Sequence, residues 1–490
     1  MRMTPLLPRL CILPAAALSL LLAACATNPV TGGSDFVLMS EEQEISLGRQ
    51  YSAEIVKEMP AYEDPELASL VQSVGDAIAA HSHRQDLIYR FTVLDSTTVN
   101  AFALPGGYIY ITRGLLAYLN SEAELAAVLG HEIGHVTARH SVRQHSTATM
   151  TGILGAVLAA STGIQGADTL TNLAGTAIVR GYGREHELEA DRLGAEYIAK
   201  TGYDPKGMLE VVGVLKNQEE FDKLVAEKEG REPNAYHGLF STHPDNDERF
   251  REVVSAAEKF RSADTARIDR DAFLQVLDGL TFGDSDEEGI VRNRHFYHKA
   301  LDFSVTFPDG WRIDNQADRI VARSTDNDGI VQVTITDLNK RITPEAFMTE
   351  RMKLEDMQHG EPITVGAFNG YSAIADGKTP YGERPVRYVV IFRDSKAWIV
   401  AGAAKDRRNP QQYDAAILAT ARSYHPLSDT EQSLAEAQHL RVIRAPAGTH
   451  YADLTKQSPL ANFPEEQLRL LNGNYPAGEP EPGSLLKIVR

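Results

Sequence analysis

Apolar and polar positions follow two different periods in the first third of the chain. Apolar side chains recur at helical spacing from about residue 41 to 58 and from about 64 to 80, which predicts two amphipathic helices. Residues 89–93 then alternate apolar and polar, as a strand does, and a second strand pattern follows a Pro-Gly-Gly turn at 108–112.

A third helix is expected to begin at Ser121, because Glu124 three residues later completes a capping box. Residues 146–176 are rich in Gly, Ala, Ser and Thr and almost uncharged. The apolar run at 150–160 is shorter than a membrane span, so we expect a buried or lid-like helix there. A further helix with a dense acidic face is expected at 182–194.

The second half of the chain is dominated by strand patterns. Strands are expected at 303–307, 320–323, 330–335, 388–392 and 397–400. Helical stretches near 344–356 and 410–424 complete a mostly antiparallel sheet with two helices. The last segment shows a strand at 440–443, a helix near 465–471 and an apolar stretch at 485–489.

Composition narrows the class of protein. The 490 residues carry a formal net charge of −18, which argues against nucleic acid as a partner because a phosphate-binding surface needs a basic field. The two cysteines, Cys11 and Cys25, both lie near the start of the chain, so no disulfide framework is expected in the folded body.

The first residues have the layout of a secretory signal. Arg2 and Arg9 precede an apolar run that ends in Leu22-Ala23-Ala24-Cys25. This ending resembles the bacterial lipobox, in which the cysteine is lipidated and becomes the first residue of the mature protein. Ala26 after Cys25 resembles lipoproteins sorted to the outer membrane. An ordinary signal cleaved near Ala24 is the alternative.

The helix that starts at Ser121 carries His131-Glu132-Ile133-Gly134-His135. Residues four apart share a helix face, so His131 and His135 can direct two imidazoles at one metal ion. Glu132 is one step round the helix and can reach a metal-bound water without ligating the metal. The pattern is typical of zinc metalloproteases, and two surface histidines beside a glutamate are the plain alternative.

A catalytic zinc needs a third protein ligand. The acidic helix offers Glu187, and Asp191 one turn later could orient a ligand histidine through its free ring nitrogen. Three neighbours compete with Glu187 on spacing alone: Glu185, His186 and Glu189. A strand just ahead of the metal helix, at 108–112, could pair its edge with an extended peptide, although two core strands would fit the pattern equally well.

These motifs together resemble peptidase family M48. The likeness rests on His131-Glu132-x-x-His135 followed by Glu187-x-x-x-Asp191, and its lipoprotein branch is matched at 28–32, 100–107 and 241–244, so that it covers about residues 27–260. It implies one zinc ion per chain, held by His131, His135 and Glu187.

The same resemblance implies roles for further residues. Glu132 would be the general base and Asp191 would orient a ligand. His243, in Ser241-Thr242-His243-Pro244, would lie near the zinc and either stabilise the transition state or occupy the open metal position, with Arg249 at the family's arginine position. A loop histidine before a proline is the plain interpretation of His243.

Two weaker likenesses complete the domain organisation. The sheet-rich region resembles the PsbP-like α/β/α sandwich, and the last segment is similar to LysM modules, which bind glycans such as peptidoglycan. The expected division is a signal peptide at 1–24, a lipidated tether at 25–40, the metallopeptidase domain at 41–265, an acidic connector at 266–298, the PsbP-like domain at 299–428 and the LysM-like module at 435–490.

The sequence therefore predicts an α+β protein. A mainly helical gluzincin-type metallopeptidase domain with a small sheet would precede an α/β sandwich-like domain and a small β-helix-β module. The expected activity is zinc-dependent hydrolysis of misfolded or misassembled envelope proteins by metal-activated water, with Glu132 as general base.

The expected location is the periplasmic face of the bacterial outer membrane, with the protein anchored through lipidated Cys25. The alternative is an envelope chaperone or scaffold lipoprotein that binds clients or peptidoglycan without cleaving. The intact Glu132 argues against it, because a purely binding protein has no need of a general base.

Overall fold

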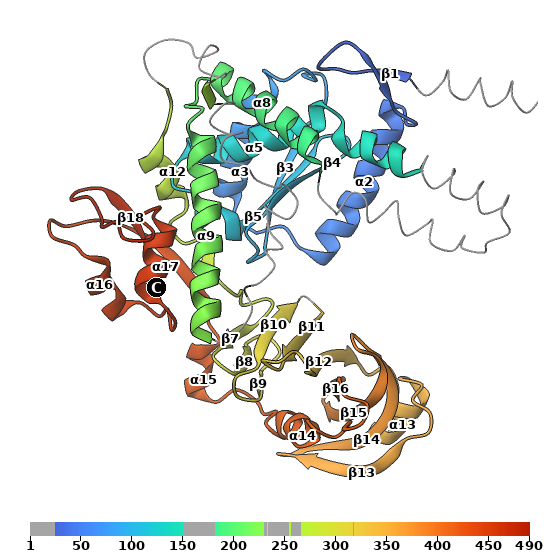
Figure 1. Cartoon of the computed structure of the whole chain (residues 1–490). Coiled ribbons are helices and arrows are strands. Elements are labelled where there is room, and N and C mark those ends of the chain that lie inside the picture. Colours follow the sequence, from blue (N-terminus) through green and yellow to red (C-terminus); the bar gives the residue numbers. More distant parts are fainter. Residues whose placement is uncertain (1–24, 150–181, 230–232, 234–253, 256–265, 317) are drawn as a thin grey trace, which may run out of the picture. The chain divides into compact units, whose positions relative to one another are not determined.

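The protein, known from a computed structural model, combines helices and sheets as the α+β prediction requires. The structure describes residues 25–149, 182–229, 233, 254–255, 266–316 and 318–490 (Figure 1). They form two compact units: unit 1 takes the described residues of 1–225, 233–280 and 440–490, and unit 2 takes those of 226–232 and 281–439. Unit 1 therefore contains segments that precede most of unit 2 in the sequence and segments that follow it.

The first two helices of unit 1 lie where the sequence predicts them. Helix α2 (Glu41–Glu58) begins at a capping box in which Ser40 and Gln43 bond each other's backbone. Helix α3 (Pro65–Ala79) begins with Asp64 as its cap and proline at its first position, where the missing N–H costs nothing.

A small three-stranded sheet follows in the order β3-β5-β4. Strand β3 (Arg90–Leu94) runs parallel to β5 (Tyr108–Thr112), and β4 (Ala101–Leu104) runs antiparallel to it. Strand β5 is paired on both sides and fully buried, so the peptide-pairing edge predicted at 108–112 is wrong. The edge strands are β3 and β4, and β4, which the sequence did not predict, packs against helix α5.

Short helix α4 (Arg113–Leu116) leads into α5 (Glu122–Thr137), which is buried along almost its whole length. Ser121 caps α5 by accepting a bond from the backbone N–H of Glu124. The carboxylate of Glu124 accepts from the N–H of Asn120 and not from Ser121, so the predicted box closes one residue earlier. The remaining helices of this part are α8 (Arg184–Thr201), α9 (Gly207–Glu229) and α12 (Arg270–Val276).

The C-terminal segment packs into unit 1. It contains β17 (Gln438–Arg444), α16 (Tyr451–Leu454), the 3-10 helix Thr455–Gln457, α17 (Pro464–Leu471) and β18 (Leu485–Val489). The ammonium of Lys487 is fully buried and donates to the carbonyls of Ala117 and Leu119, just after α4. The ring of Phe221, on α9, contacts those of Phe463 and Tyr475. The segment predicted as a separate module at 435–490 thus shares its core, from residue 440 on, with unit 1.

Unit 2 is built on a seven-stranded antiparallel sheet in the order β10-β11-β12-β16-β15-β14-β13. Its strands are β10 (Arg312–Gln316), β11 (Arg319–Arg323), β12 (Gly329–Asp337), β13 (Gln358–Val365), β14 (Phe368–Thr379), β15 (Gly382–Arg393) and β16 (Lys396–Ala404). The antiparallel sheet with two helices agrees with the sequence prediction, which missed β10, β13 and β14.

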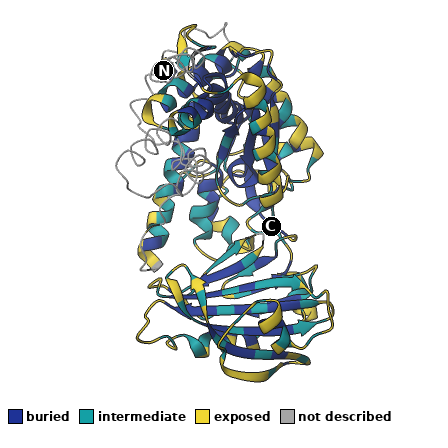
Figure 2. Cartoon of the chain, turned by 90° about the vertical axis from the view of Figure 1, so that its right-hand side faces the viewer, coloured by how far each residue is buried: buried dark blue, intermediate teal, exposed yellow. Residues whose placement is uncertain are grey.

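Helices α13 and α14 of unit 2 cover opposite faces of this sheet. Side chains alternate across a strand, so Val389 and Val390 of β15 point to different faces. Helix α14 (Asp414–Arg422) packs with the cluster around Val389, and α13 (Pro344–Glu350) packs with the cluster around Val390. Figure 2 shows the buried positions running through the middle of each unit.

The stretch predicted as an acidic connector at 266–298 contains regular structure in addition to α12. Strand β6 (Thr281–Phe282) pairs with the start of β17. Strands β7 (Ile290–Arg292) and β8 (His295–His298) form a separate sheet with β9 (Phe303–Thr306), and helix α15 (Asp429–Leu434) precedes β17.

The predicted tether contains a hairpin of β1 (Cys25–Thr27) and β2 (Ser34–Phe36). In its turn the Asn28 side chain accepts from the N–H groups of Val30 and Thr31 and donates to Asp35.

No helix among the described ranges is both long enough and apolar enough to cross a membrane.

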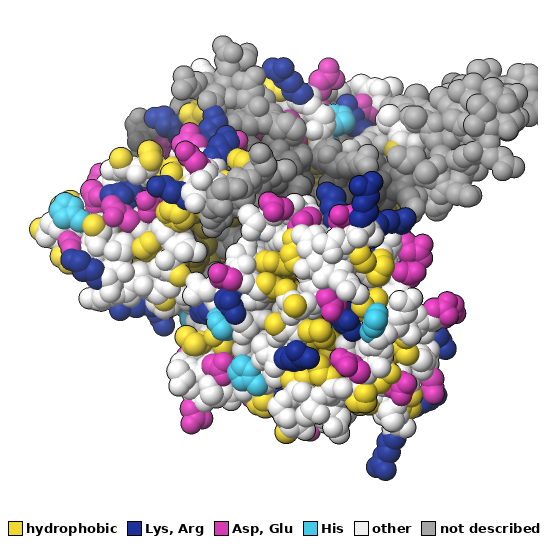
Figure 3. Space-filling view, turned by 60° about the horizontal axis from the view of Figure 1, so that its bottom comes forward, with side chains coloured by type: hydrophobic (Ala, Val, Ile, Leu, Met, Phe, Trp, Pro, Cys, Tyr) yellow, Lys and Arg dark blue, Asp and Glu magenta, His cyan; other side chains and the backbone are white. Residues whose placement is uncertain are grey.

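On the face drawn in Figure 3, Lys and Arg are interspersed with Asp and Glu, so its described part carries no field of a single sign.

Candidate metal centre

Helix α5 presents two imidazoles to the same point. The Nε2 atoms of His131 and His135 lie 3.0 Å apart, as expected for residues one turn apart on one helix face. His135 is fully buried, and the side chain of His131 is 12% exposed.

Helix α8 brings the third candidate ligand to this point. One carboxylate oxygen of Glu187 lies 3.5 Å from Nε2 of His131, and the other lies 3.6 Å from Nε2 of His135. A tetrahedral zinc with bonds of about 2.0–2.2 Å separates its ligand atoms by about 3.3–3.6 Å. In the described part of the chain, His131, His135 and Glu187 are the group whose side chains could hold a metal ion. The two distances to the carboxylate lie in this range, the two Nε2 atoms, at 3.0 Å, are closer together, and the donor types suit zinc.

Small residues allow the two helices to come this close. A Cβ added at Gly134 would lie 2.7 Å from the carbonyl oxygen of Ala190, and one added at Gly194 would lie 2.8 Å from the backbone nitrogen of His131. Any larger side chain at these crossing points would push α8, and with it Glu187, away from the histidines.

The charges of the site favour a cation. Glu132, Glu187 and Asp191 are all fully buried, and buried carboxylates require positive partners. Burial lowers the pKa of His131, but its bonds to Asp191 and Glu187 and their charges outweigh this effect and raise it to about 10. The site therefore attracts a proton when no metal competes for His131.

Each histidine has a different partner on the outer side of its ring. Nδ1 of His131 lies 2.8 Å from Oδ1 of Asp191, in the arrangement predicted for that carboxylate. Nδ1 of His135 lies 2.8 Å from Nδ1 of His140, whose Nε2 lies 3.0 Å from Oε2 of Glu189.

Arg143 donates to the same oxygen of Glu189 at 3.0 Å. The bond from His140, aided by Arg143, lowers the pKa of Glu189 to about 2, and burial lowers the pKa of His140.

The three residues that competed with Glu187 on spacing do not join the cluster. Glu185 is exposed, Glu189 bonds His140 and Arg143, and the ring of His186 stacks on that of His140 at 4.3 Å.

Sequence reasoning missed two residues of the site. His140 lies in the helical stretch 140–149, beyond a break after α5, so its spacing from the motif gave no signal. Tyr182 precedes α8, and its ring stacks on His135 at a centroid distance of 4.0 Å.

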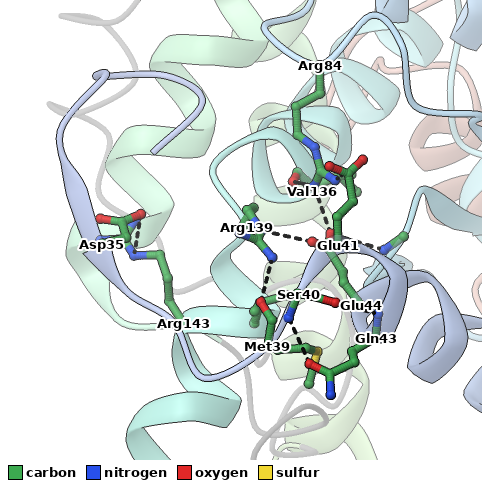
Figure 4. A network of polar contacts seen from close by, with 12 residues as sticks. Asp35, Met39, Ser40, Glu41, Gln43, Glu44, Arg84, Val136, Arg139 and Arg143 are labelled. Carbon is green, nitrogen blue, oxygen red and sulfur yellow. Dashed lines mark hydrogen bonds and ion pairs between the residues drawn. The ribbon is translucent and has the colours of Figure 1, made fainter. Parts of the chain in front are cut away.

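A buried ionic network holds the C-terminal end of α5, close to His135 (Figure 4). The carboxylate of Glu44, on α2, accepts from Arg84 at 2.7 Å and from Arg139 at 2.8 Å. Arg84 also donates to the carbonyl of Val136 in the last turn of α5, and Arg139 donates to the carbonyl of Met39. The end of the metal-site helix is thus tied to the residues that follow the N-terminal hairpin.

Several predicted features lie outside the described residues. They are His243, Arg249, the apolar run at 150–160 and the signal segment at 1–24.

Comparison with known proteins finds a family that part of the chain matches. Residues 63–257 match peptidase family M48. The chain is 30% identical over 244 residues to the beta-barrel assembly-enhancing protease of Escherichia coli K12, which covers 48% of each chain. It is 27% identical over 191 residues to metalloprotease LoiP of the same organism, which covers 38% of this chain and 69% of that one. The chain spans about half the length of the first of these relatives.

Among solved structures, cyanobacterial PsbP from Synechocystis sp. PCC 6803 covers 30% of this chain and 98% of its own. The TM-score is 0.22 and the identity 13%. A likeness at this level carries no argument about the fold, so the PsbP-like assignment stays a prediction.

Proposed function

We propose, on the premise that residues 63–257 form a peptidase family M48 domain, that this protein is a zinc-dependent endopeptidase. The observation that supports the proposal is the convergence of His131, His135 and Glu187 from α5 and α8, whose ligand atoms all lie within 4.8 Å of one another. One zinc ion per chain would be held there.

A zinc ion held by His131, His135 and Glu187 would lower the pKa of a bound water to about 7 and would polarise a carbonyl group. The chain's own residues supply the rest. Glu132 lies next to His131 on α5 and is fully buried, which suits a carboxylate that takes a proton from the attacking water and returns it to the leaving amine. Asp191 accepts from Nδ1 of His131 and so keeps Nε2 free for the metal.

Two further elements would bind the substrate. The edge strand β4 packs against α5 and offers backbone groups with which an extended peptide can pair. His243 would assist as a donor to the developing oxyanion, as the family resemblance implies.

The setting of the activity follows from the relatives and the sequence. One relative is named for enhancing β-barrel assembly, and we propose misfolded or misassembled envelope proteins as the substrates of this chain. The lipobox-like ending at Cys25 supports anchoring to the membrane, with the periplasmic face of the outer membrane as the location. Binding of peptidoglycan by the C-terminal segment is a separate proposal, supported by its likeness to LysM modules.

The test compares wild type with Glu132→Gln and with a matched control, Glu196→Gln. Glu196 lies on α8 and pairs with Lys200 on the surface. We expect wild type and both variants to contain one zinc per chain by elemental analysis. Cleavage of an unfolded envelope protein should fall about 10²–10⁴-fold in Glu132→Gln alone, the usual contribution of a general base.

Three results would contradict the proposal. Equal cleavage by Glu132→Gln would exclude Glu132 as the base, and a zinc content unchanged in His131→Ala would exclude the ligand set. If Glu132→Gln fully replaced the wild type in cells that lack the protein, the function would be binding of clients without cleavage.

A further inference from the structure

We infer that His140 is a positioning residue of the metal centre, which holds His135 by its outer ring nitrogen and is held in turn by Glu189. The inference rests on the proposed metal centre and adds residues beyond its ligand set. It starts from the short approach of two imidazoles, Nδ1 of His135 to Nδ1 of His140 at 2.8 Å, in a fully buried place.

The position of one proton follows from the ligand geometry. Nε2 of His135 faces the other ligand atoms, so this nitrogen must present its lone pair to the metal. A neutral imidazole that binds a metal through Nε2 carries its proton on Nδ1. His135 therefore donates, and Nδ1 of His140 accepts.

The position of the second proton then follows. Because His140 accepts at Nδ1, its own proton lies on Nε2, which is 3.0 Å from Oε2 of Glu189. Arg143 donates to the same oxygen and fixes the carboxylate. The contacts from His135 to His140, from His140 to Glu189 and from Arg143 to Glu189 thus each join a donor to an acceptor.

Ring stacking fixes the planes of both imidazoles. The ring of Tyr182 lies on that of His135, with centroids 4.0 Å apart and planes 19° apart. The ring of His186 lies on that of His140, with centroids 4.3 Å apart and planes again 19° apart. Neither imidazole can turn without losing a stacked neighbour and a hydrogen bond.

An imidazole in this place also limits negative charge. His131 already has a carboxylate, Asp191, behind it, and Glu132 and Glu187 are buried beside it. A second carboxylate directly behind His135 would add one more negative charge to the buried site. His140 moves that charge out to Glu189, where the guanidinium of Arg143 balances it.

The test is zinc affinity, measured by competition with a chromophoric chelator on the full chain. His140→Leu removes the acceptor for His135 and should weaken zinc binding about 10–100-fold, the usual effect of losing an outer partner of a ligand. His140→Asn keeps a carbonyl oxygen close to the position of Nδ1 and should restore most of that loss.

The matched control is His83→Leu. His83 also bonds α8, through the hydroxyl of Tyr197 at 2.7 Å, but it has no bond to a ligand. Its loss should leave zinc affinity unchanged. Cobalt substitution gives a second readout, because the visible bands of bound Co²⁺ should shift in His140→Leu and not in His83→Leu.

The outcomes separate this inference from the proposed function. A wild type that binds no zinc overturns the metal centre and the inference with it. A wild type that binds zinc together with a His140→Leu variant of equal affinity and equal cobalt spectrum overturns the inference alone. If His140→Leu does not fold, the zinc affinity of Glu189→Gln is measured in its place. Weaker zinc binding supports the inference that Glu189 holds His140, and unchanged binding overturns it.

Discussion

At the scale of single residues, Arg139 adopts an unfavourable backbone conformation just after the end of helix α5. Its side chain makes contacts that compensate for this conformation. Its φ of 55° lies in the left-handed region, which a residue with a side chain occupies at a cost of about 1–2 kcal/mol. A glycine would avoid that cost. The arginine instead bonds Glu44 and the carbonyl of Met39 from this position, so the strained backbone serves to place its guanidinium.

The network predicts a large effect for Glu44→Gln. The change removes the buried carboxylate that Arg84 and Arg139 share, and breaking a buried ion pair in this way costs about 3–5 kcal/mol. We expect the free energy of unfolding in urea to fall by that amount.

The control is Glu41→Gln, because Glu41 is half-exposed and lies 3.4 Å from the same Arg84. An exposed pair contributes about 0–1 kcal/mol, so this variant should unfold almost as the wild type does. Equal losses in the two variants would contradict a special role for the buried carboxylate.

At the scale of elements, the metal centre depends on how closely α5 and α8 cross. We predict that Gly194→Ala forces the helices apart, because its new Cβ would lie 2.8 Å from the backbone nitrogen of His131. The cost should be about 1–3 kcal/mol of unfolding free energy. Zinc affinity should fall as well, since Glu187 would move away from both histidines.

Gly213→Ala on helix α9 is the matched control. A Cβ there meets no atom within 4 Å, so alanine should stabilise the protein by about 0.5–1 kcal/mol through helix propensity and leave zinc affinity unchanged. A Gly194→Ala variant that binds zinc as tightly as the wild type would show that the crossing distance does not set the site.

The helices of the metal centre could be predicted because their signals are local. Spacing of four places His131 beside His135 and Glu187 beside Asp191, and both pairs lie as expected. Neither pattern predicts that the two helices meet. That expectation came from the family resemblance. His140 was missed because a break in the helix after Thr137 ends the regular spacing.

The strands that were missed share a physical reason. Strand β4 is only four residues long and mostly apolar, too short to show an alternating period. Strand β13 is exposed along most of its length, and the second half of β14 contains Asp376, Gly377 and Lys378, so neither shows a continuous apolar face. Such strands exist because neighbouring strands supply their hydrogen bonds.

At the scale of the whole molecule, unit 1 contains a contact between residues far apart in the sequence. Lys487 bonds the carbonyls of Ala117 and Leu119. Burial lowers the pKa of Lys487 and raises that of Glu124, its acidic neighbour at the start of α5. The two carbonyls that Lys487 bonds follow α4, so β18 supports the turn from which the metal-site helix starts. This contact joins parts of the chain that the sequence patterns assigned to separate domains.

The lowered pKa predicts a pH dependence with a definite sign. Between the lowered value in the folded protein and the ordinary value near 10.5, the unfolded chain holds a proton on Lys487 that the folded protein has lost. The unfolding free energy should therefore rise with pH in this window, by at most about 1.4 kcal/mol per pH unit. Urea unfolding of wild type and Lys487→Met from pH 7 to 9.5 measures the difference.

Lys487→Met should lack this rise and should be less stable by about 3 kcal/mol near neutral pH, because Glu124 and two carbonyls lose their partner. Lys456→Met, which removes an exposed lysine paired with Asp453 in the same segment, should follow the wild-type curve. Parallel curves for Lys487→Met and wild type would refute the assignment.

The contact between Lys487 and the carbonyls after α4 can form only late in the synthesis of the chain. The chain appears in order during synthesis, so residues 120–484 must all emerge after these carbonyls and before β18 can reach its place. At about 5–20 residues per second this interval is on the order of 20–70 s. During this interval the turn before α5 lacks the buried ammonium group that bonds its carbonyls in the folded protein.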